Sequence, residues 1–320
     1  MSERQRAKVY ERAWDDVLAV RRPAPGVVRA AGADRLGLLQ RLSTNDLAGL
    51  GPQQVRTTVL TTALARIVDV VRVVELGETA LLVCGHGRGA DVRAWLQRYI
   101  FFQDDVQLEI GAEPWSLWSL LGPQADHALA ALAPQGQAPR GEEVVSFAGG
   151  LAWRVAAPAR GGLALLLDEQ GEARAQALWA MGPAEDEAYQ ALRIEAGLPE
   201  TGREIDGERL PPEVGLEHAV SLSKGCYIGQ EILARMDTRG KLAWCLAGVL
   251  LEAPAAPGAG LTQGGARVGE LTSAAVSPRR GPVGLAVVRP GALAHEQGTV
   301  LLGGGPARGR LVELPMGEEA

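Results

Sequence analysis

The stretch LSKGCYIGQEILARM, residues Leu222–Met236, places one cysteine between two glycines, directly before a helix-like run. Gly225 and Gly229 allow the backbone to turn sharply or to approach a ligand closely. Lys224 lies two residues before Cys226. A helix that begins near Gly229 would also point its N-terminal amide groups at this loop. Because a nearby cation and a helix N-terminus both stabilise a thiolate, the stretch predicts a loop that carries a reactive thiol.

A buried, inert side chain is the alternative for Cys226, since free cysteines in proteins mostly serve as small apolar residues. The chain has 3 cysteines, and Cys84 and Cys245 form no CxxC pair with it or with each other. This number argues against a disulfide framework and against a four-thiolate cluster or zinc site within one chain. The 4 histidines are scattered without metal-ligand spacing, so we expect no metal site.

Composition sets wider bounds on function. The chain has 320 residues, enough for two or three domains, and 47% of them are hydrophobic and 22% charged, as in soluble globular proteins. The net charge of −6 gives the whole molecule no electrostatic attraction to nucleic acid or anionic membranes. The N-terminal segment is charged and lacks the apolar core of a signal peptide. We therefore expect a cytoplasmic protein with no direct nucleic-acid or membrane partner.

A carboxylate on an apolar helix face is the second unusual feature. The stretch EDEAYQALRIEAGLP, residues 185–199, predicts a helix on which Glu195 shares one face with the apolar residues three, four and seven positions before it. A buried carboxylate is costly unless it accepts hydrogen bonds or meets a cation. An amino-pyrimidinone ring would offer it two parallel N–H donors. A salt bridge to an internal arginine, such as Arg193 or Arg203, is the alternative.

The remaining pattern predicts an α+β protein. Residues 34–50 predict a helix broken by a Ser-Thr-Asn-Asp turn, and residues 55–76 predict two strands joined by a turn near Leu64–Arg66. After Lys241 the chain changes to short strands separated by glycine and proline, which is typical of a small barrel or sandwich. We place a domain boundary near Gly240, with a body at 1–240 and a barrel at 241–320.

The two motifs together resemble a known family. KGCYIGQE at 224–231, after RIEAGLP at 193–199, is similar to the YgfZ family of folate-binding proteins, which are linked to iron–sulfur cluster assembly and repair and to tRNA modification. That family is related to the glycine cleavage T-protein, a tetrahydrofolate-dependent aminomethyltransferase. LQRLSTNDL, SLLGPQADHAL and VGELTSAAVSPRRGPVGLAVV resemble further elements of the family, so the resemblance covers most of the chain.

The resemblance implies a fold, a cofactor and partners. The implied fold has two intertwined antiparallel-sheet subdomains and a C-terminal β-barrel, arranged in a ring around a channel that holds a folate. The implied cofactor is tetrahydrofolate or a one-carbon derivative, and the implied partners are iron–sulfur client or assembly proteins. Cys226 would act as the reactive thiolate, with Lys224 as its electrostatic partner. The positions that the resemblance assigns to cofactor binding are Glu195, Arg193, Asp69, Gly225, Tyr227, Gly229, Gln230 and Glu231.

One departure from the T-protein pattern bears on activity. The T-protein carries an Asp pair in a G-x-I-x-D-D strand, whereas ARIVDVVRV here has Asp69 followed by Val70. Asp69 would share a strand face with Ile67, Val71 and Val73, so we expect it to point inward. The missing second acid favours an accessory factor. An aminomethyltransferase or folate-dependent demethylase, and a binding-only protein that senses folate or docks a partner, remain open as alternatives.

Overall fold

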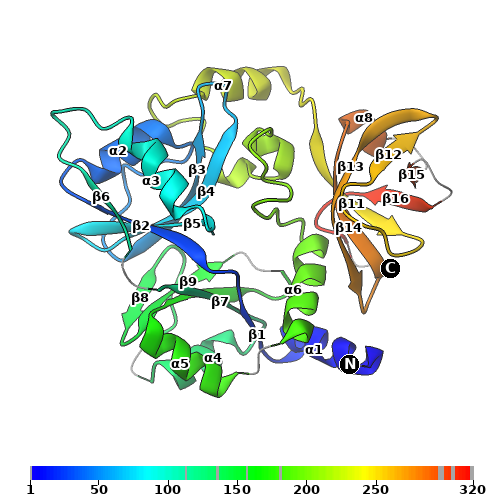
Figure 1. Cartoon of the computed structure of the whole chain (residues 1–320), viewed down its shortest axis with the longest axis horizontal. Coiled ribbons are helices and arrows are strands. Elements are labelled where there is room, and N and C mark those ends of the chain that lie inside the picture. Colours follow the sequence, from blue (N-terminus) through cyan, green and yellow to red (C-terminus); the bar gives the residue numbers. More distant parts are fainter. Residues whose placement is uncertain are drawn as a thin grey trace.

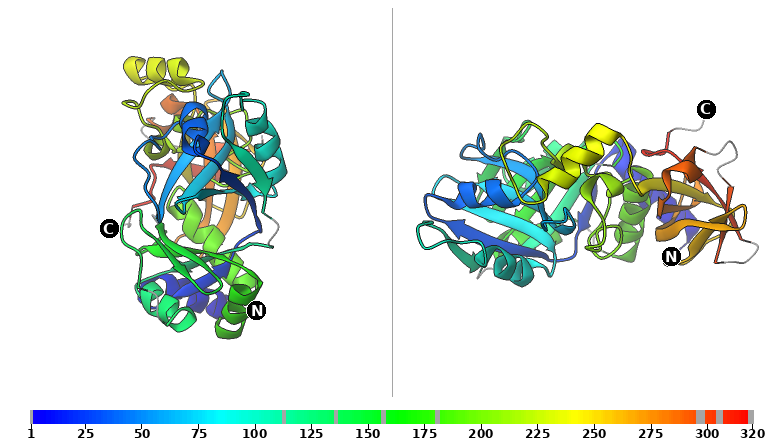
Figure 2. Two further views of the ribbon diagram at one scale, coloured as in Figure 1. Left: turned by 90° about the vertical axis from the view of Figure 1, so that its left-hand side faces the viewer. Right: turned by 90° about the horizontal axis from the view of Figure 1, so that it is seen from above.

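The computed structural model of the chain describes residues 2–111, 114–134, 137–155, 158–179, 182–294, 299–303 and 307–317. Figure 1 shows three lobes arranged in a triangle: two sheet lobes and a barrel lobe. Seen from above in Figure 2, the first sheet and the barrel form opposite ends of an elongated molecule. Helices and antiparallel sheets are thus combined as the predicted α+β class requires.

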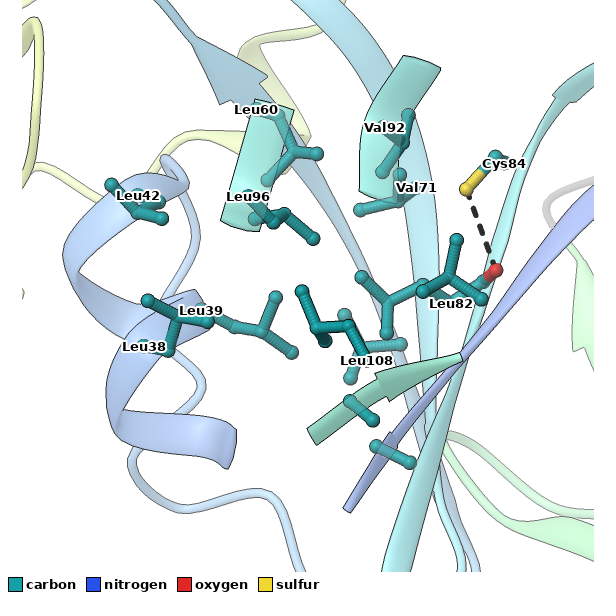
Figure 3. Packing of buried hydrophobic residues seen from close by; sticks show 14 of the residues in the cluster. Leu38, Leu39, Leu42, Leu60, Val71, Leu82, Cys84, Val92, Leu96 and Leu108 are labelled. Carbon is teal, nitrogen blue, oxygen red and sulfur yellow. Dashed lines mark hydrogen bonds between the residues drawn. The ribbon is translucent and has the colours of Figure 1, made fainter. Parts of the chain in front are cut away.

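The first lobe is a five-stranded antiparallel sheet with the order β3-β4-β5-β2-β6. Its strands are β2 (Pro25–Ala31), β3 (Gln54–Thr61), β4 (Ile67–Glu75), β5 (Thr79–His86) and β6 (Gln107–Ile110). The valine-rich sequence of β4 suits a strand that is buried on both faces. Helices α2 (Arg35–Leu42) and α3 (Gly89–Gln97) cover one face, where their leucines meet Leu60, Leu82 and Leu108 (Figure 3).

The second lobe is a five-stranded sheet with the order β1-β7-β10-β9-β8. Its strands are β1 (Leu18–Arg21), β7 (Ser116–Leu121), β8 (Val144–Phe147), β9 (Gly150–Val155) and β10 (Gly162–Leu167), and it carries α4 (Ala125–Leu132) and α5 (Glu169–Leu178). Because β1 joins this sheet while β2 to β6 form the other, the two lobes are intertwined. One cluster, with Val83 from the first sheet and Trp153 and Leu166 from the second, packs the sheets together.

The third lobe is a closed antiparallel barrel with the order β11-β14-β13-β12-β15-β16. Its strands are β11 (Cys245–Leu251), β12 (Gly260–Gln263), β13 (Ala266–Ser277), β14 (Gly281–Val288), β15 (Thr299–Leu302) and β16 (Arg308–Val312), with the short helix α8 (Pro290–Leu293). Closure leaves no sheet edge unpaired. The predicted fold class, including the C-terminal barrel, is confirmed. The boundary near Gly240 stays a prediction.

Helix α6 (Pro183–Glu195) lies where the lobes meet and packs on α1 (Glu3–Asp15), β1, β13 and β14. Residues 201–223 follow it as a long loop that contains two short 3-10 helices, Pro211–Val214 and Glu217–Ala219. The chain then enters the KGCYIGQE loop and α7 (Gln230–Arg239). Within the described ranges, no helix combines the length and apolar composition that a membrane span requires.

Candidate functional site

Cys226 is exposed on the loop that precedes α7, whereas Cys84 is buried in the core of the first sheet. The alternative of a buried apolar plug is therefore wrong for Cys226. Ile228, two residues on, anchors the loop: its N–H donates to the Arg41 carbonyl at 3.0 Å and its carbonyl accepts from Thr61 Oγ1 at 3.0 Å. The sulfur is thus presented to solvent by a backbone that is fixed to the first lobe.

Lys224 is buried and its ammonium group points into the end of α2. Its Nζ donates to the carbonyl oxygens of Gln40, Ser43 and Asn45 at 2.9, 2.7 and 2.6 Å. Burial lowers the pKa of Lys224 to about 8, and the negative charge of Asp46 opposes that shift. The three carbonyl oxygens use the three N–H donors of the ammonium group, so Lys224 could act on the thiol directly only through its charge. This electrostatic role stays a prediction.

Two further residues shape this loop. Gly229 has a φ of +85°, and a Cβ built there would lie 2.7 Å from the Thr62 carbonyl oxygen and 3.0 Å from Ala65 Cα. Only glycine fits this close approach to the β3–β4 turn. Tyr227 is buried against the same turn, its ring centroid 5.0 Å from Lys224 Nζ, and its hydroxyl has no partner among the described residues.

The other predicted residues of the loop lie at its surface. Gly225 has no atom within 4 Å of a built Cβ, so space does not require glycine there. Gln230 and Glu231 begin α7, where Glu231 is exposed and Gln230 partly buried. A carboxylate in this first turn suits the helix dipole. Their predicted roles in cofactor binding stay predictions.

Glu195 lies at the end of α6, and the residue is 8% exposed. Its Oε2 accepts a hydrogen bond from the Tyr10 hydroxyl at 2.7 Å, and its Oε1 is buried without a partner among the described residues. Burial, together with this hydrogen bond and the Glu195 charge, raises the pKa of Tyr10. The alternative of a salt bridge to Arg193 or Arg203 is wrong, because both arginines meet other carboxylates.

Asp69 is fully buried on β4, as expected for an inward-facing residue. Its Oδ1 accepts from the Val70 N–H and its Oδ2 from the Gly85 N–H, each at 2.9 Å. Burial raises the pKa of Asp69, and the two amide donors oppose that shift. A Cβ built at Gly85 would touch both Asp69 Oδ1 and Thr201 Oγ1, so the start of the long loop lies beside this acid.

A buried charge network around α6 was missed in the sequence. Arg193 is 1% exposed and meets Glu204 at 3.4 Å and Glu200 at 3.5 Å. Glu204 also accepts from Ser273 Oγ, on β13, at 2.5 Å. Arg22 meets Glu200 at 2.6 Å. The sequence offered one signal for this network. Glu200 and Glu204 lie four residues apart at the start of the long loop, after the helix that contains Arg193.

The predicted residues do not form one cluster in this structure. The Cys226 loop packs on α2 and the β3–β4 turn, whereas Glu195 packs against α1. Figure 1 places α7 at the top of the molecule and α6 in its lower centre. Among the described residues, no hydrogen bond or ion pair joins the Cys226 loop to Glu195 or Asp69. A separate surface groove of about 620 Å³, lined by residues such as Gly87, Ala90 and Trp115, contains none of the predicted site residues.

Comparisons with known proteins identify a matching family model and several relatives of this chain. The family model described as the GCVT N-terminal domain matches residues 25–142. An aminomethyltransferase of Rubrobacter xylanophilus is 32% identical over 306 residues, which are 91% of this chain and 80% of that protein. A chloroplastic protein of Arabidopsis thaliana that is named as a transferase is 30% identical over 267 residues. The matched part is 78% of this chain but only 59% of the Arabidopsis protein.

Two further similarities are more distant. The tRNA-modifying protein YgfZ of Vibrio vulnificus is 29% identical over 242 residues, which are 72% of this chain and 70% of that protein. The crystal structure of the glycine cleavage system aminomethyltransferase T from Bartonella henselae superposes with a TM-score of 0.81. The superposition covers 98% of this chain and 90% of that one at 23% identity, so it concerns the fold.

Proposed function

The chain belongs to the aminomethyltransferase family, and from this premise we propose that it is a tetrahydrofolate-binding accessory protein of the YgfZ type. It acts in the cytoplasm and supports the assembly or repair of iron–sulfur clusters in client enzymes, some of which modify tRNA. The Cys226 thiol is the group that acts on the cluster or on the partner protein. Lys224 and Gly229 give the loop its shape.

The presentation of Cys226 carries this proposal. The thiol is exposed, while its neighbour Tyr227 and the nearby Lys224 are buried. A fixed backbone therefore holds the sulfur where a partner protein can reach it, which an apolar core residue could not do. The YgfZ relative from Vibrio vulnificus supports the same branch of the family.

The unpaired oxygen of Glu195 supports a pterin ligand. A buried acceptor without a donor is rare, and each case needs an explanation. The amino-pyrimidinone part of tetrahydrofolate carries N–H donors that would satisfy Oε1, while Tyr10 keeps Oε2. Glu195 would hold the ring, with Arg193 and Asp69 as further polar groups of the same cofactor site. When bound, the folate supplies a one-carbon carrier.

Titration with tetrahydrofolate tests the cofactor assignment. Glu195→Gln should weaken binding by about tenfold or more, because a hydrogen bond to a charged acceptor is replaced by one to a neutral acceptor. Calorimetry of the wild type, of this variant and of the control Glu187→Gln, an exposed acid on the same helix, measures the difference. The cofactor assignment fails if the wild type does not bind, or if Glu195→Gln binds as tightly as the wild type.

Replacement of Cys226 in cells tests the accessory role. Cells that carry Cys226→Ala should lose activity of iron–sulfur enzymes, while Cys245→Ala, a partly buried thiol of the barrel, should leave those activities unchanged. Full activity of the iron–sulfur enzymes with Cys226→Ala would refute the role of the thiol. The protein would then sense folate or dock a partner without using its thiol.

Aminomethyl transfer is the second candidate function. The aminomethyltransferase of Rubrobacter xylanophilus, 32% identical over 91% of this chain, favours it, as does the retained Asp69. Val70 beside Asp69 counts against it, since the second acid of the T-protein pair is missing. Turnover of an aminomethyl donor in the presence of tetrahydrofolate would establish this function, and Asp69→Asn should then abolish the turnover.

A further inference from the structure

The segment at 40–46, which contains the Ser-Thr-Asn-Asp turn after α2, supports the loop that carries the thiol. Three of its backbone carbonyl oxygens accept hydrogen bonds from the ammonium group of Lys224, at 2.9, 2.7 and 2.6 Å. They belong to Gln40, Ser43 and Asn45, and together they are called the carbonyl cage below. Lys224 is 7% exposed, so these three bonds replace the water that the ammonium group loses on burial.

The first lobe builds the cage without using the lysine. Asn45 ties the turn to β3, because its side-chain amide donates to the Thr57 carbonyl and its backbone N–H donates to Thr58 Oγ1, both at 2.8 Å. The side chain of Gln40 donates to Asp46 at 2.9 Å and closes the turn from the other side. These bonds would hold the three carbonyl oxygens in place if the ammonium group were removed.

The loop is attached to the same segment on both sides of the lysine. Before it, the N–H of Ser221 donates to the Thr44 carbonyl at 2.9 Å. After it, the N–H of Ile228 donates to the Arg41 carbonyl at 3.0 Å. Cys226 lies between the lysine and this second backbone attachment. The ammonium group is therefore the middle one of three attachments that fix the course of the loop.

We propose that Lys224 is a positioning residue, which fixes the place of the Cys226 thiol by filling the carbonyl cage, and that the cage is a specific site for a primary ammonium group. An ammonium group carries three rotatable N–H donors at one atom, which matches three oxygens around a point. A guanidinium group is planar and spreads its donors over a fork, so it fits this cage poorly. As an account of how the thiol is used, this inference rests on the proposed function.

Amide hydrogen exchange at pH 7 measures the attachment of the loop. Lys224→Met keeps the length of the side chain but loses its donors, and Lys224→Arg keeps the charge but loses the donor geometry. In both variants the amides of Ser221 and Ile228 should exchange about tenfold faster or more, because hydrogen bonds from a charged group are lost. The control Lys241→Met, at an exposed lysine after α7, should exchange like the wild type. Wild-type exchange of both amides in Lys224→Met would refute the positioning role.

The pH dependence of thiol labelling separates position from charge. The positioning role expects Lys224→Met and Lys224→Arg to give the same labelling curve for Cys226, since both empty the cage. A curve that shifts in Lys224→Met and stays wild type in Lys224→Arg would show that the lysine acts on the thiol through its charge. That result would overturn the inference.

Chemical rescue tests the ammonium site itself. In Lys224→Ala the missing part of the side chain has the length of n-propylammonium, which should restore slow exchange of both amides at constant ionic strength. Tetramethylammonium has the same charge but no N–H donor, so it should have no effect. Rescue by both cations or by neither refutes the site. Should Lys224→Ala not fold alone, its refolding in each cation gives the same comparison. Because folate, cluster and partner are absent, failure here leaves the cellular test of Cys226→Ala unaffected.

Discussion

Exposure and pKa distinguish the three cysteines of the chain. Cys226 is exposed, whereas burial raises the pKa of Cys84 and of Cys245. Each unit by which a thiol pKa exceeds the pH reduces its thiolate about tenfold, and the thiolate is the reactive form. Access therefore favours Cys226, and the raised pKa values of the other two thiols disfavour them.

Ellman's reagent should label one thiol rapidly in the native protein near pH 8. The fast phase should disappear in Cys226→Ala and remain in Cys245→Ala, and unfolding in guanidinium should expose all three thiols of the wild type. Rapid labelling of native Cys226→Ala would contradict the assignment of Cys226 as the accessible thiol.

The sequence predicted the loop that carries Cys226 but not its support. The two glycines of KGCYIGQE indicated a sharp turn, and Cys226 lies on a loop that precedes a helix. The carbonyl groups that hold Lys224 belong to residues 40–45, and a contact across so many residues has no signature in a local pattern. For the same reason the Tyr10 partner of Glu195 could not be predicted, because it comes from a helix far away in the chain.

At the scale of elements, the loop and the β3–β4 turn are fitted to each other through Gly229. Gly229→Ala should destabilise the protein by about 2 kcal/mol or more, because the residue has a positive φ and its new Cβ would meet the Thr62 carbonyl. Gly225→Ala, in the same loop, has open space and an ordinary φ, so it should change stability little. Urea unfolding of both variants measures the difference, and equal stability would show that the loop is not clamped to this turn.

Elements with a strong hydrophobic period were predicted, and polar ones were missed. The strands β3 and β4, the helix α6 and the helix after Gly229 match the sequence expectations closely. Helix α1 was missed because it is mostly charged and buries only Tyr10 and Ala13. Helix α5 was missed for the same reason, since it buries only Gly171 and Ala175. Such helices owe their place to tertiary contacts rather than to an apolar stripe.

At the scale of the whole molecule, Glu204 couples the barrel to the body. It is fully buried and joins Arg193 of α6 to Ser273 of β13. Glu204→Gln should lower stability by about 1–3 kcal/mol, because the buried guanidinium group of Arg193 loses one of its two carboxylate partners and keeps Glu200. Calorimetry should show a lower melting temperature, and a barrel that unfolds separately from the body would locate the effect at this joint. The control Glu208→Gln, an exposed acid of the same loop, should melt like the wild type.

Composition and resemblance predicted the overall architecture. They did not predict the contacts that join the lobes. Short strands separated by glycine and proline indicated a small barrel or sandwich, and the family resemblance indicated the barrel and the paired sheets. The interleaving of β1 with β7 depends on which distant strand each edge meets, and strand pairing of this range is not encoded in a local window.

Glu195 is where early and late parts of the polypeptide come together. Its side chain accepts from Tyr10, and its backbone carbonyl accepts from the N–H of Met316 at 2.8 Å. The ribosome synthesises residue 10 long before residue 316. In a nascent chain, Glu195 therefore lacks its contact with Met316 until the barrel has been translated. The surroundings of Glu195 are therefore completed late in synthesis, and premature release of the chain would yield a body in which Glu195 lacks its contact with Met316.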